Sequence, residues 1–279
     1  MKKVQYRILK FLLTSAFLFL FLRIALYDGL VVRQYEVRSS LLSDSHTYVL
    51  LTDLHATCYG RNQQTLLSMI ERYSPEAVFL SGDMADDKRD FAGTAVLLKA
   101  LCSRFPSYYV TGNHERWVEY TDDIKGLMRS YGVTVLDETA DPVFIGGGEI
   151  RLFGLNDPLF YENTFKYLSC LESLDESEET FDLLLAHRPE FFEQYVAAGF
   201  DLTLCGHAHG GQVRIPFFLN GLYAPNQGYF PEYAGGWYGT AEHGGMIVSR
   251  GLMKDELPRI FNPPEVCVVR ILPEKEKKS

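Results

Sequence analysis

The chain lacks the cysteine pattern of disulfide-rich or thiolate-bound proteins. Its cysteines are odd in number, widely spaced and without a Cys-x-x-Cys pair: Cys58, Cys102, Cys170, Cys205 and Cys267. This pattern indicates neither a disulfide framework nor a structural zinc site. We find no internal repeat and no low-complexity segment, and 279 residues are enough for one large domain with a substantial core.

Clustered positive charge is also missing. The formal net charge is -9, and Lys275 to Lys278 read only as part of a charged tail over residues 274–279. Proteins bind a nucleic-acid backbone through clustered Lys and Arg, so we expect no nucleic-acid partner. The negative net charge does not exclude a small phosphorylated substrate, because bound divalent cations can dominate the local electrostatic field.

Long apolar runs are absent except at the N-terminus. There the basic residues Lys2, Lys3, Arg7 and Lys10 precede an apolar run from Phe11 to Leu22. A membrane span needs about 20 residues, and Lys10 and Arg23 can extend along lipid to give a span over residues 8–27. We therefore predict a membrane anchor or signal-anchor in residues 1–30, with a cleaved signal and a surface-lying helix as alternatives.

The basic N-terminus predicts the orientation of this single span. Positive charge favours the cytoplasmic side, which places the rest of the chain outside the cytoplasm. Arg23, Arg33 and Arg38, on the other side of the run, count against that orientation.

Beyond a connector over residues 31–44, we predict one domain over residues 45–273. Apolar runs of strand length alternate there with segments of helical spacing, which is typical of an α/β fold. A hairpin is expected over 143–154, and long ordered loops over 210–264. The predicted strands are 48–52, 77–81, 108–111, 182–186, 202–205, 246–249 and 266–271, and the predicted helices are 63–73, 93–105, 122–131 and 190–198.

Five polar motifs directly follow the first five of these strands. They read Asp53-Leu54-His55, Gly82-Asp83, Gly112-Asn113-His114-Glu115, Ala186-His187-Arg188-Pro189 and Gly206-His207-Ala208-His209-Gly210. Ligands collect beyond the carboxyl ends of strands in open α/β sheets. Imidazole, carboxylate and amide oxygen together suit Mn, Fe, Zn, Ni or Co.

The motifs therefore predict a two-metal hydrolytic site. Asp53 and His55 can reach one ion, and the carboxylate of Asp83 is suited to bridge two cations that would otherwise repel each other. The spacing leaves open whether His207 and His209 share an ion or serve different ones.

The order of the five motifs resembles the calcineurin-like metallophosphoesterase superfamily. Further matches resemble its bacterial branch with an N-terminal membrane anchor: Gly210-Gly211-Gln212-Val213-Arg214, Tyr223-Ala224-Pro225-Asn226, Ser249-Arg250-Gly251 and Asn262-Pro263-Pro264-Glu265. The resemblance covers residues 45–272. It implies an α/β four-layer sandwich of two mixed β-sheets flanked by helices.

The resemblance also implies how the residues divide their roles. Asp53, His55 and His209 would bind one divalent ion, Asn113, His187 and His207 the other, and Asp83 would bridge them. His114 would be the non-ligand histidine that stabilises the transition state or protonates the leaving oxygen. The resemblance does not identify the metals. The candidates are Mn, Fe, Zn, Ni, Co and Mg.

The implied function is a dinuclear metal-dependent phosphoesterase. A metal-bridging hydroxide would attack the phosphorus of a phosphodiester, a pyrophosphate or a phosphomonoester, and we expect a phosphodiesterase rather than a phosphomonoesterase. The substrate would be a phosphorylated small molecule or a lipid-linked phosphate. The alternative is a non-catalytic, membrane-tethered metal-binding module on the same fold.

Residues around the predicted ligands complete the site. Glu115 and Asp157 are expected to accept hydrogen bonds from metal-binding histidines, although Asp157 also fits a turn before Pro158. Gln212, Arg214 and Arg250 are expected near the substrate phosphate, with pairing to an acidic loop as the alternative. His46 and His243 lie outside the motifs and are expected on the surface or in loops.

Overall fold

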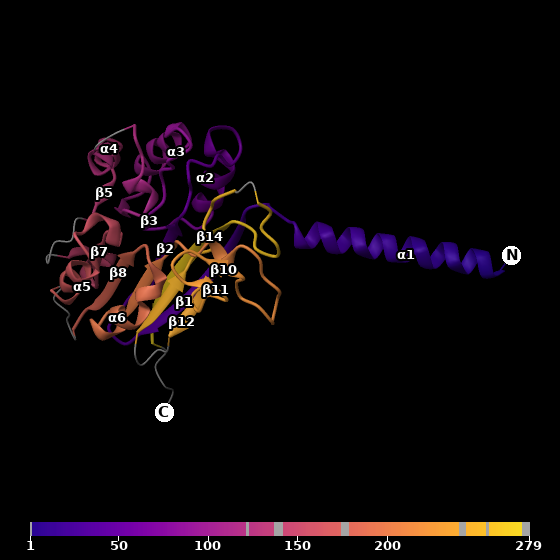
Figure 1. The fold of residues 1–279 in the computed structure, drawn as a ribbon. Coiled ribbons are helices and arrows are strands. Elements are labelled where there is room, and N and C mark those ends of the chain that lie inside the picture. The colour runs from indigo at the N-terminus through magenta and orange to yellow at the C-terminus, as the bar shows by residue number, and fades with distance from the viewer. Residues whose placement is uncertain are drawn as a thin grey trace, which may run out of the picture.

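The computed structural model describes residues 2–120, 123–136, 142–173, 179–239, 244–254 and 257–274. A domain built on two sheets carries one long helix that projects away from it (Figure 1). His243 and all of the predicted charged tail except residue 274 lie outside the described residues.

The first sheet has six strands in the described part of the chain. β2, β3, β4 and β5 are parallel, whereas β14 runs antiparallel to β2 and parallel to β1. In spatial order the strands are β1 (Val31–Ser39), β14 (Glu265–Pro273), β2 (His46–Leu51), β3 (Ala77–Ser81), β4 (Ser107–Val110) and β5 (Thr134–Val135).

The second sheet also has six described strands and is likewise mixed. Its central strands β13, β9, β8 and β7 are parallel, and the outer strands β12 and β6 are antiparallel to their neighbours. In spatial order the strands are β12 (Gly236–Gly239), β13 (Gly245–Val248), β9 (Leu202–Cys205), β8 (Phe181–Ala186), β7 (Ile150–Leu155) and β6 (Val143–Ile145).

The central strands are buried on both faces, because side chains alternate between two cores. Tyr48 and Leu50 of β2 pack between the sheets with residues such as Leu185. Val49 and Leu51 point the other way, into the core beneath the helices. This double burial explains the nearly continuous apolar runs that predicted the strands.

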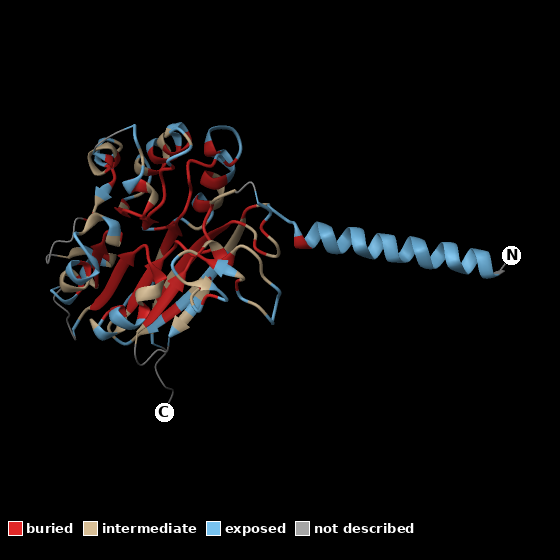
Figure 2. Cartoon of the chain, viewed as in Figure 1, coloured by how far each residue is buried: buried red, intermediate tan, exposed pale blue. Residues whose placement is uncertain are grey.

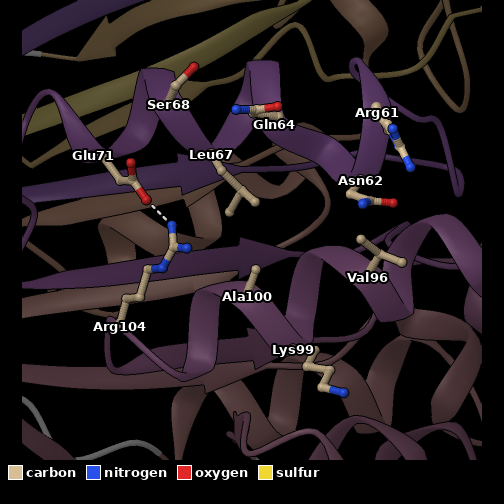
Figure 3. Close-up of a pocket in the computed structure, with 10 residues that line it drawn as sticks. All are labelled: Arg61, Asn62, Gln64, Leu67, Ser68, Glu71, Val96, Lys99, Ala100 and Arg104. Atoms are coloured by element: carbon tan, nitrogen blue, oxygen red, sulfur yellow. Dashed lines mark hydrogen bonds and ion pairs between the residues drawn. The ribbon is translucent and has the colours of Figure 1, made fainter.

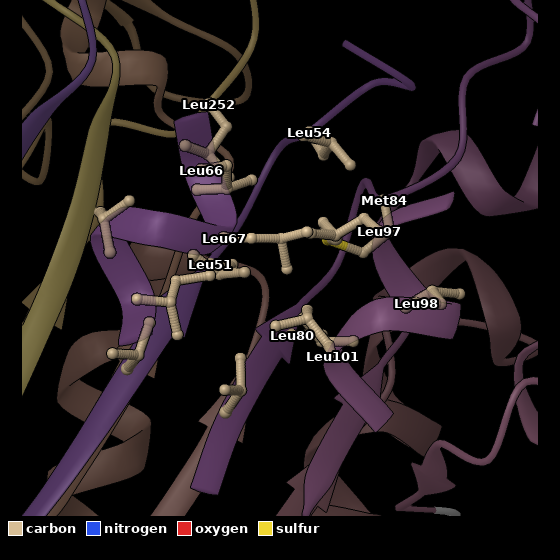
Figure 4. Close-up of a cluster of buried hydrophobic side chains, with 14 of the residues drawn as sticks. Leu51, Leu54, Leu66, Leu67, Leu80, Met84, Leu97, Leu98, Leu101 and Leu252 are labelled. Carbon is tan, nitrogen blue, oxygen red and sulfur yellow. The ribbon is translucent and has the colours of Figure 1, made fainter. Parts of the chain in front are cut away.

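Helices cover the outer face of each sheet. The buried leucines Leu66, Leu97 and Leu101 of α2 and α3 pack on the first sheet (Figure 4). Burial is concentrated in the strands and on the inward faces of the helices (Figure 2). The helices are α2 (Gln64–Glu71), α3 (Ala92–Cys102) and α4 (Ile124–Ser130) on the first sheet, and α5 (Thr164–Glu172) and α6 (Phe192–Ala197) on the second. The predicted four-layer α/β sandwich of two mixed β-sheets flanked by helices is confirmed.

The prediction of a connector over residues 31–44 was wrong for most of that segment. Val31–Ser39 forms β1 and pairs with β14 over its full length. The strand lies at the edge of the sheet, and most of its side chains are exposed or half-buried, with only Val37 buried. Because the strand is largely polar, the pattern of apolar runs did not predict it.

The N-terminal segment is a single helix, α1 (Lys2–Ala25). Within Lys3–Ala25, an 18-residue window has a mean hydropathy of 2.0, and almost all of that window is exposed. Among the described residues this is the one helix long and apolar enough to cross a membrane. The helix lies apart from the domain, so burial inside the protein does not account for its apolar character (Figure 2).

Short elements lie in the loops. The predicted long loops over 210–264 contain the two-stranded hairpin of β10 (Tyr223–Ala224) and β11 (Gly228–Tyr229), as well as β12 and β13. The hairpin predicted over 143–154 is confirmed by the antiparallel pairing of β6 with β7. The remaining elements are single 3-10 turns: η1 (Arg61–Gln63), η2 (His114–Arg116), η3 (Gly146–Gly148), η4 (Pro158–Phe160), η5 (Pro189–Phe191) and η6 (His209–Gly211).

Candidate metal centre

The five motifs converge at one edge of the sandwich. They follow β2, β3 and β4 of the first sheet and β8 and β9 of the second. The register brings these strand ends level, because Leu51 pairs with Leu80 and Ser81 with Val110. The loops that follow are therefore neighbours, although they come from distant parts of the chain.

Of the seven predicted metal ligands, all except Asn113 lie in groups of adjacent ligand atoms, and the amide next to Asn113 donates to Asp83. Six are buried, with exposed fractions of 0 to 5%: Asp53, His55, Asp83, Asn113, His187 and His207. The seventh, His209, keeps 17% of its side chain exposed. Such burial of five ionisable groups needs a strong compensating interaction.

Asp83 lies at the centre of the cluster. Its Oδ2 atom is 3.6 Å from Nε2 of His55 and 3.2 Å from Nε2 of His187. One potential ligand group contains Asp53, His55, Asp83 and His209, and another contains Asp83, His187 and His207, with the ligand atoms of each group within 4.8 Å of one another. Asp83 is the residue common to the two groups.

The cluster leaves its central polar atoms without hydrogen bonds. Among the described residues, buried atoms without a partner include His55 Nε2, Asp83 Oδ2, Asn113 Oδ1 and His187 Nε2. A buried polar atom without a partner costs about 1–3 kcal/mol, and four in one place are not explained by packing. All four are nitrogen and oxygen atoms of kinds that bind divalent metal ions, and both histidine nitrogens lie within 3.6 Å of Asp83 Oδ2.

The electrostatics of the cluster favour positive charge. Burial alone would raise the pKa of Asp53, but His209 and His187 outweigh it and lower that pKa. The same holds for Asp83, whose pKa is lowered by His187 and His55. The carboxylates in turn raise the pKa of His187 to about 10 against the opposing effect of burial. Two buried carboxylates of this kind stabilise a cation between them.

The backbone is strained where it carries these side chains. Asp53, His55, Asp83, His207 and His209 all have φ between 45° and 67°, a region that residues other than glycine rarely adopt. Such strain persists only where surrounding structure holds it, and it is concentrated at functional sites. Five such residues in one cluster indicate that the loops are shaped for the site.

Two glycines allow the loops to approach closely. A Cβ on Gly82 would lie 2.4 Å from Nδ1 of His187, and a Cβ on Gly112 would lie 2.3 Å from Oδ1 of Asp83. Gly82 also has φ of 79°. Any side chain at either position would displace a predicted metal ligand.

Glu115 supports the loop of Asp83. Its carboxylate accepts hydrogen bonds from the amides of Asp83, Ala85 and Gly112 at 2.7 to 2.9 Å. Burial, and then the nearby charge of Asp83, raises the pKa of Glu115 to about 7. The expectation that Glu115 accepts a hydrogen bond from a metal-binding histidine was wrong, because its two oxygens bind backbone amides.

Two aspartates that follow the Gly-Asp motif hold histidine rings instead. Asp86 Oδ2 lies 3.1 Å from Nδ1 of His55, and Asp87 Oδ1 lies 2.8 Å from Nδ1 of His114. From the sequence alone, these two acids are expected to be solvated loop residues. Their position three and four residues after Asp83 was the only available signal.

His114 was not predicted as a ligand, but its ring forms a third group of adjacent possible ligands with His55 and Asp86. Its backbone amide donates a hydrogen bond to Oδ1 of Asp83 at 2.8 Å. Its ring packs edge-on against His55, with centroids 4.4 Å apart, and against Trp117. About a quarter of the side chain, 23%, is exposed, so His114 is open to solvent and to a substrate.

Arg188 links the remaining side of the cluster. It forms a two-pronged ion pair with Asp157 and donates to Asn226, and its Nη1 atom lies 3.0 Å from Nε2 of His207. Asp157 was expected to contact a histidine directly, but it pairs with Arg188, which contacts His207. Asp157 also accepts from the amide of Leu159, as expected for a turn before Pro158. Arg188 follows His187 directly in the sequence, but nothing in that position predicted its partners.

The side chains of Gln212, Arg214 and Arg250 donate hydrogen bonds to residues outside the cluster. Gln212 donates to the carbonyl of Leu257, and Arg214 donates to Asn220. Arg250 is buried and pairs with Glu265 at 2.8 Å. For Arg250 this is the pairing with an acidic loop that the sequence left open, and the expectation of phosphate contact finds no support in these partners.

A separate groove lies between α2 and α3, far from this chemistry. Its lining includes Arg61, Leu67, Val96 and Lys99, and the ion pair of Arg104 with Glu71 lies across it (Figure 3). No described histidine lines this groove. It has none of the unpaired, buried donor atoms of the histidine cluster.

The buried ligand atoms and their order along the chain agree with one family. The family model described as calcineurin-like phosphoesterase matches residues 46–211. The chain belongs to this family. All seven predicted ligands and His114 lie within the matched residues, and the family makes the protein a metallophosphoesterase with clustered potential metal ligands.

Relatives of this calcineurin-like phosphoesterase are similar over much of its length. The metallophosphoesterase YkuE of Bacillus subtilis is 27% identical over 249 residues, which are 84% of this chain and 83% of that protein. Phosphodiesterase YaeI of Escherichia coli is 31% identical over 51% of this chain and 52% of its own. A transmembrane protein with a metallophosphoesterase domain from Danio rerio is 28% identical over 73% of this chain and 47% of its own.

Proposed function

We propose that this metallophosphoesterase is a dinuclear enzyme that hydrolyses phosphodiester or pyrophosphate bonds, with phosphomonoesters as a further substrate class. The observation that carries the proposal is the set of unpaired buried atoms around Asp83. His55 Nε2, Asp83 Oδ2, Asn113 Oδ1 and His187 Nε2 are all buried and all lack hydrogen-bond partners. A non-catalytic metal-binding module on the same fold would share these ligand atoms, so the turnover assay below separates the two functions.

The seven side chains divide into two ligand sets in this proposal. Asp53, His55 and His209 hold one divalent ion, Asn113, His187 and His207 hold the second, and Asp83 is shared. Oδ2 of Asp83 supports this division, since it lies within 3.6 Å of one histidine from each set. In His207, Nε2 is engaged with Arg188 and Asn226, which leaves Nδ1 for an ion.

Divalent ions in these positions would supply an activated water and positive charge around the phosphoryl oxygens. The carboxylates Asp53 and Asp83 keep the two positive charges close together. Asp86 and the carbonyl of Ser81 orient the rings of His55 and His187 through their Nδ1 atoms, at 3.1 and 2.8 Å. Partners of this kind fix the tautomer and direct Nε2 at the ion.

His114 is the proposed proton donor to the leaving oxygen. It is partly exposed, unlike the buried ligands, and it lies next to His55. Asp87 holds Nδ1 of the ring at 2.8 Å, which leaves Nε2 for the substrate. A positioned imidazole contributes about 10²–10⁴-fold to such a step.

We further propose that α1 is a transmembrane anchor and that the catalytic domain lies outside the cytoplasm. The support is the exposed apolar surface of α1 together with the basic residues Lys3, Arg7 and Lys10 near its start. The similar protein of Danio rerio is a transmembrane protein by name. A substrate at the membrane surface, such as a lipid-linked phosphate, would suit an enzyme held there.

Turnover by the metal-stripped full-length chain in detergent tests the catalytic proposal. The protein is reloaded with Mn, Fe, Zn, Ni, Co or Mg and assayed on bis(p-nitrophenyl) phosphate and on p-nitrophenyl phosphate. We expect turnover to require metal and to be faster on the diester. The expected preference for the diester comes from the name of the similar phosphodiesterase YaeI. Comparing the two substrates tests this preference separately from the metal requirement.

Matched variants separate metal chemistry from folding. Asp83→Asn removes the shared carboxylate, whereas Asp201→Asn changes an acid that accepts from the amide of Asp182, at the opposite end of β8 from His187. Activity should vanish in the first and persist in the second. Equal activity of Asp83→Asn and the unaltered chain, with every metal tested, would end the proposal.

A further inference from the structure

One loop of the domain exposes an unusual number of large apolar side chains. The loop spans residues 215–230, and we call it the aromatic loop. Its most exposed residues are Phe217 at 105%, Phe218 at 88%, Tyr229 at 72%, Phe230 at 69% and Ile215 at 50%. Single exposed apolar residues are ordinary on soluble proteins, but five large ones within one loop indicate a contact surface.

The aromatic loop is held in an ordered conformation by polar contacts beneath it. The amides of Phe218 and Leu219 donate to the carbonyl of Ile215, and the amide of Phe230 donates to the carbonyl of Leu222 at 2.8 Å. The ring of Tyr223 packs on that of Tyr229, with centroids 5.3 Å apart.

Two of the phenylalanines occupy strained backbone positions in this loop. Phe217 and Phe230 have φ of 70° and 57°, which bulky residues avoid. The loop therefore keeps its phenylalanines in water at a cost in both hydration and backbone energy. A partner that removes these rings from water would offset that cost.

The base of the loop is joined to the C-terminal end of α1. The amide of Arg214 donates to the carbonyl of Ile260 at 2.9 Å, and the next residue, Phe261, donates to the carbonyl of Ala25 at 2.7 Å. The rings of Phe21 and Phe261 meet edge-on, with centroids 5.6 Å apart. The loop and the end of α1 are thus fixed to the same short segment.

The picture of the whole chain agrees with this connection. The loop around β10 and β11 lies on the side of the domain from which α1 projects (Figure 1). In the burial view, that loop and α1 are both exposed (Figure 2).

A lipid surface is the occupant that these observations favour. α1 brings the loop to the bilayer, and aromatic side chains are enriched at membrane interfaces, where rings meet lipid and polar groups meet water. The net charge of -9 argues against attraction by anionic lipid. The apolar rings themselves would therefore drive the contact.

We propose that the aromatic loop inserts Phe217, Phe218, Tyr229 and Phe230 into the membrane interface beside α1, as a second point of attachment. This inference rests on the proposed membrane anchoring and adds the surface of the domain that faces the lipid. Two attachment points would fix the tilt of the domain, which a single helix leaves free.

The loop also connects the lipid surface with the metal centre. It begins soon after His209, and Asn262, next to Phe261, donates to the carbonyl of His209 at 2.7 Å. Arg259 donates to the same carbonyl. The segment that holds the loop against α1 therefore also holds a predicted metal ligand, so lipid contact positions the site relative to the membrane.

Tryptophan quenching by brominated lipid tests this contact with the full-length chain in vesicles. In a chain whose native Trp117 and Trp237 are replaced by Phe, Phe218→Trp places a reporter at the loop, and Tyr229→Trp provides a second. Phe165→Trp is the matched control, because Phe165 is 80% exposed but lies on α5, away from α1 in Figure 1. Phe17→Trp, in the middle of α1, reports on the anchor itself.

We expect quenching of the loop reporters to exceed that of Phe165→Trp several-fold. It should be similar in zwitterionic and anionic vesicles and unchanged in high salt, because the contact is apolar. Each Phe removed from the loop should weaken the contact between the loop and the lipid about tenfold. Phe217→Ser together with Phe218→Ser should therefore abolish quenching of Tyr229→Trp.

The reporters distinguish failure of this inference from failure of the anchor. If Phe17→Trp is quenched and both loop reporters are not, the loop faces water, another protein or a second copy of the chain, and the inference is overturned. If Phe17→Trp is also unquenched, the anchoring proposal fails and the inference fails with it.

Discussion

Nε2 of His187 lies 3.2 Å from Oδ2 of Asp83, and neither atom has a hydrogen-bond partner among the described residues. The two residues come from different sheets, 104 positions apart in the sequence. An imidazole and a carboxylate so close would normally form a hydrogen bond. Here the two atoms are close, but their orientation does not give a hydrogen bond. This arrangement is the one expected if both atoms face an ion.

Metal removal should destabilise the protein through Asp83. A bound ion stabilises the folded state by mass action, by about 4 kcal/mol at a thousandfold excess over its dissociation constant. We expect chelation to lower the melting temperature of the unaltered chain and to leave that of Asp83→Asn unchanged. Calorimetric melts with and without chelator measure the difference, and equal shifts in both proteins would contradict a shared role for Asp83.

His114→Ala should reduce turnover and spare metal binding. The ring is not among the proposed ligands, so metal content should stay at that of the unaltered chain while kcat falls about 10²–10⁴-fold. Asp87→Asn weakens the contact at Nδ1 of the ring and should give a smaller loss of kcat. Metal analysis beside steady-state kinetics checks both variants, and loss of metal from His114→Ala would assign that ring to the ligands instead.

Glu115→Gln should loosen the Asp83 loop. The carboxylate accepts from three buried amides, and an amide NH₂ in its place would face at least one of these donors. A buried donor without a partner costs about 1–3 kcal/mol, and metal affinity should fall with the loss of loop order. Urea unfolding and metal titration measure the two effects.

The control for Glu115 is a surface glutamate. Glu193→Gln changes an exposed carboxylate whose partner is the hydroxyl of Tyr233 at 3.4 Å. It should leave both stability and metal affinity unchanged. If Glu115→Gln behaves in the same way, the three hydrogen bonds do not hold the loop.

His46 should make stability depend on pH. Its ring is buried between Glu76 and Glu149 at 2.9 and 3.1 Å, so the expectation of a surface or loop histidine was wrong. Burial opposes the charge, but the two carboxylates outweigh it and raise the pKa of His46. A raised pKa means that the stabilisation is complete below about pH 6.5 and is lost as pH rises through the raised value.

Thermal melts of His46→Gln and the unaltered chain from pH 5.5 to 8.5 test this effect. The stability difference should be about 1 kcal/mol at the acidic end and should shrink as the pH rises. Since His46 lies at the opposite end of β2 from Asp53, metal binding should be unaffected. A difference that grows with pH would show that the neutral ring is the stabilising form.

Much of the fold follows from local patterns. The predicted strands 77–81 and 202–205 match β3 and β9 at both ends, because their apolar runs are buried on both faces. The edge strand β1 was missed for the opposite reason, since alternating polar side chains in a half-exposed strand resemble a connector. α5 was missed as well, and its exposed Phe165 and buried Tyr167 show how weakly a short helix is marked.

The sequence by itself determined the ligand types, their order and the motifs that carry them, because each motif is a local signal at the end of an apolar strand. Only the tertiary structure decided the contacts between motifs: Arg188 with Asp157, Asp86 with His55, and Glu115 with the Asp83 loop. These contacts depend on the register of two sheets, which brings strand ends level across long sequence separations. No spacing along the chain encodes that alignment, and the same holds for the aromatic loop, which the fold places beside α1.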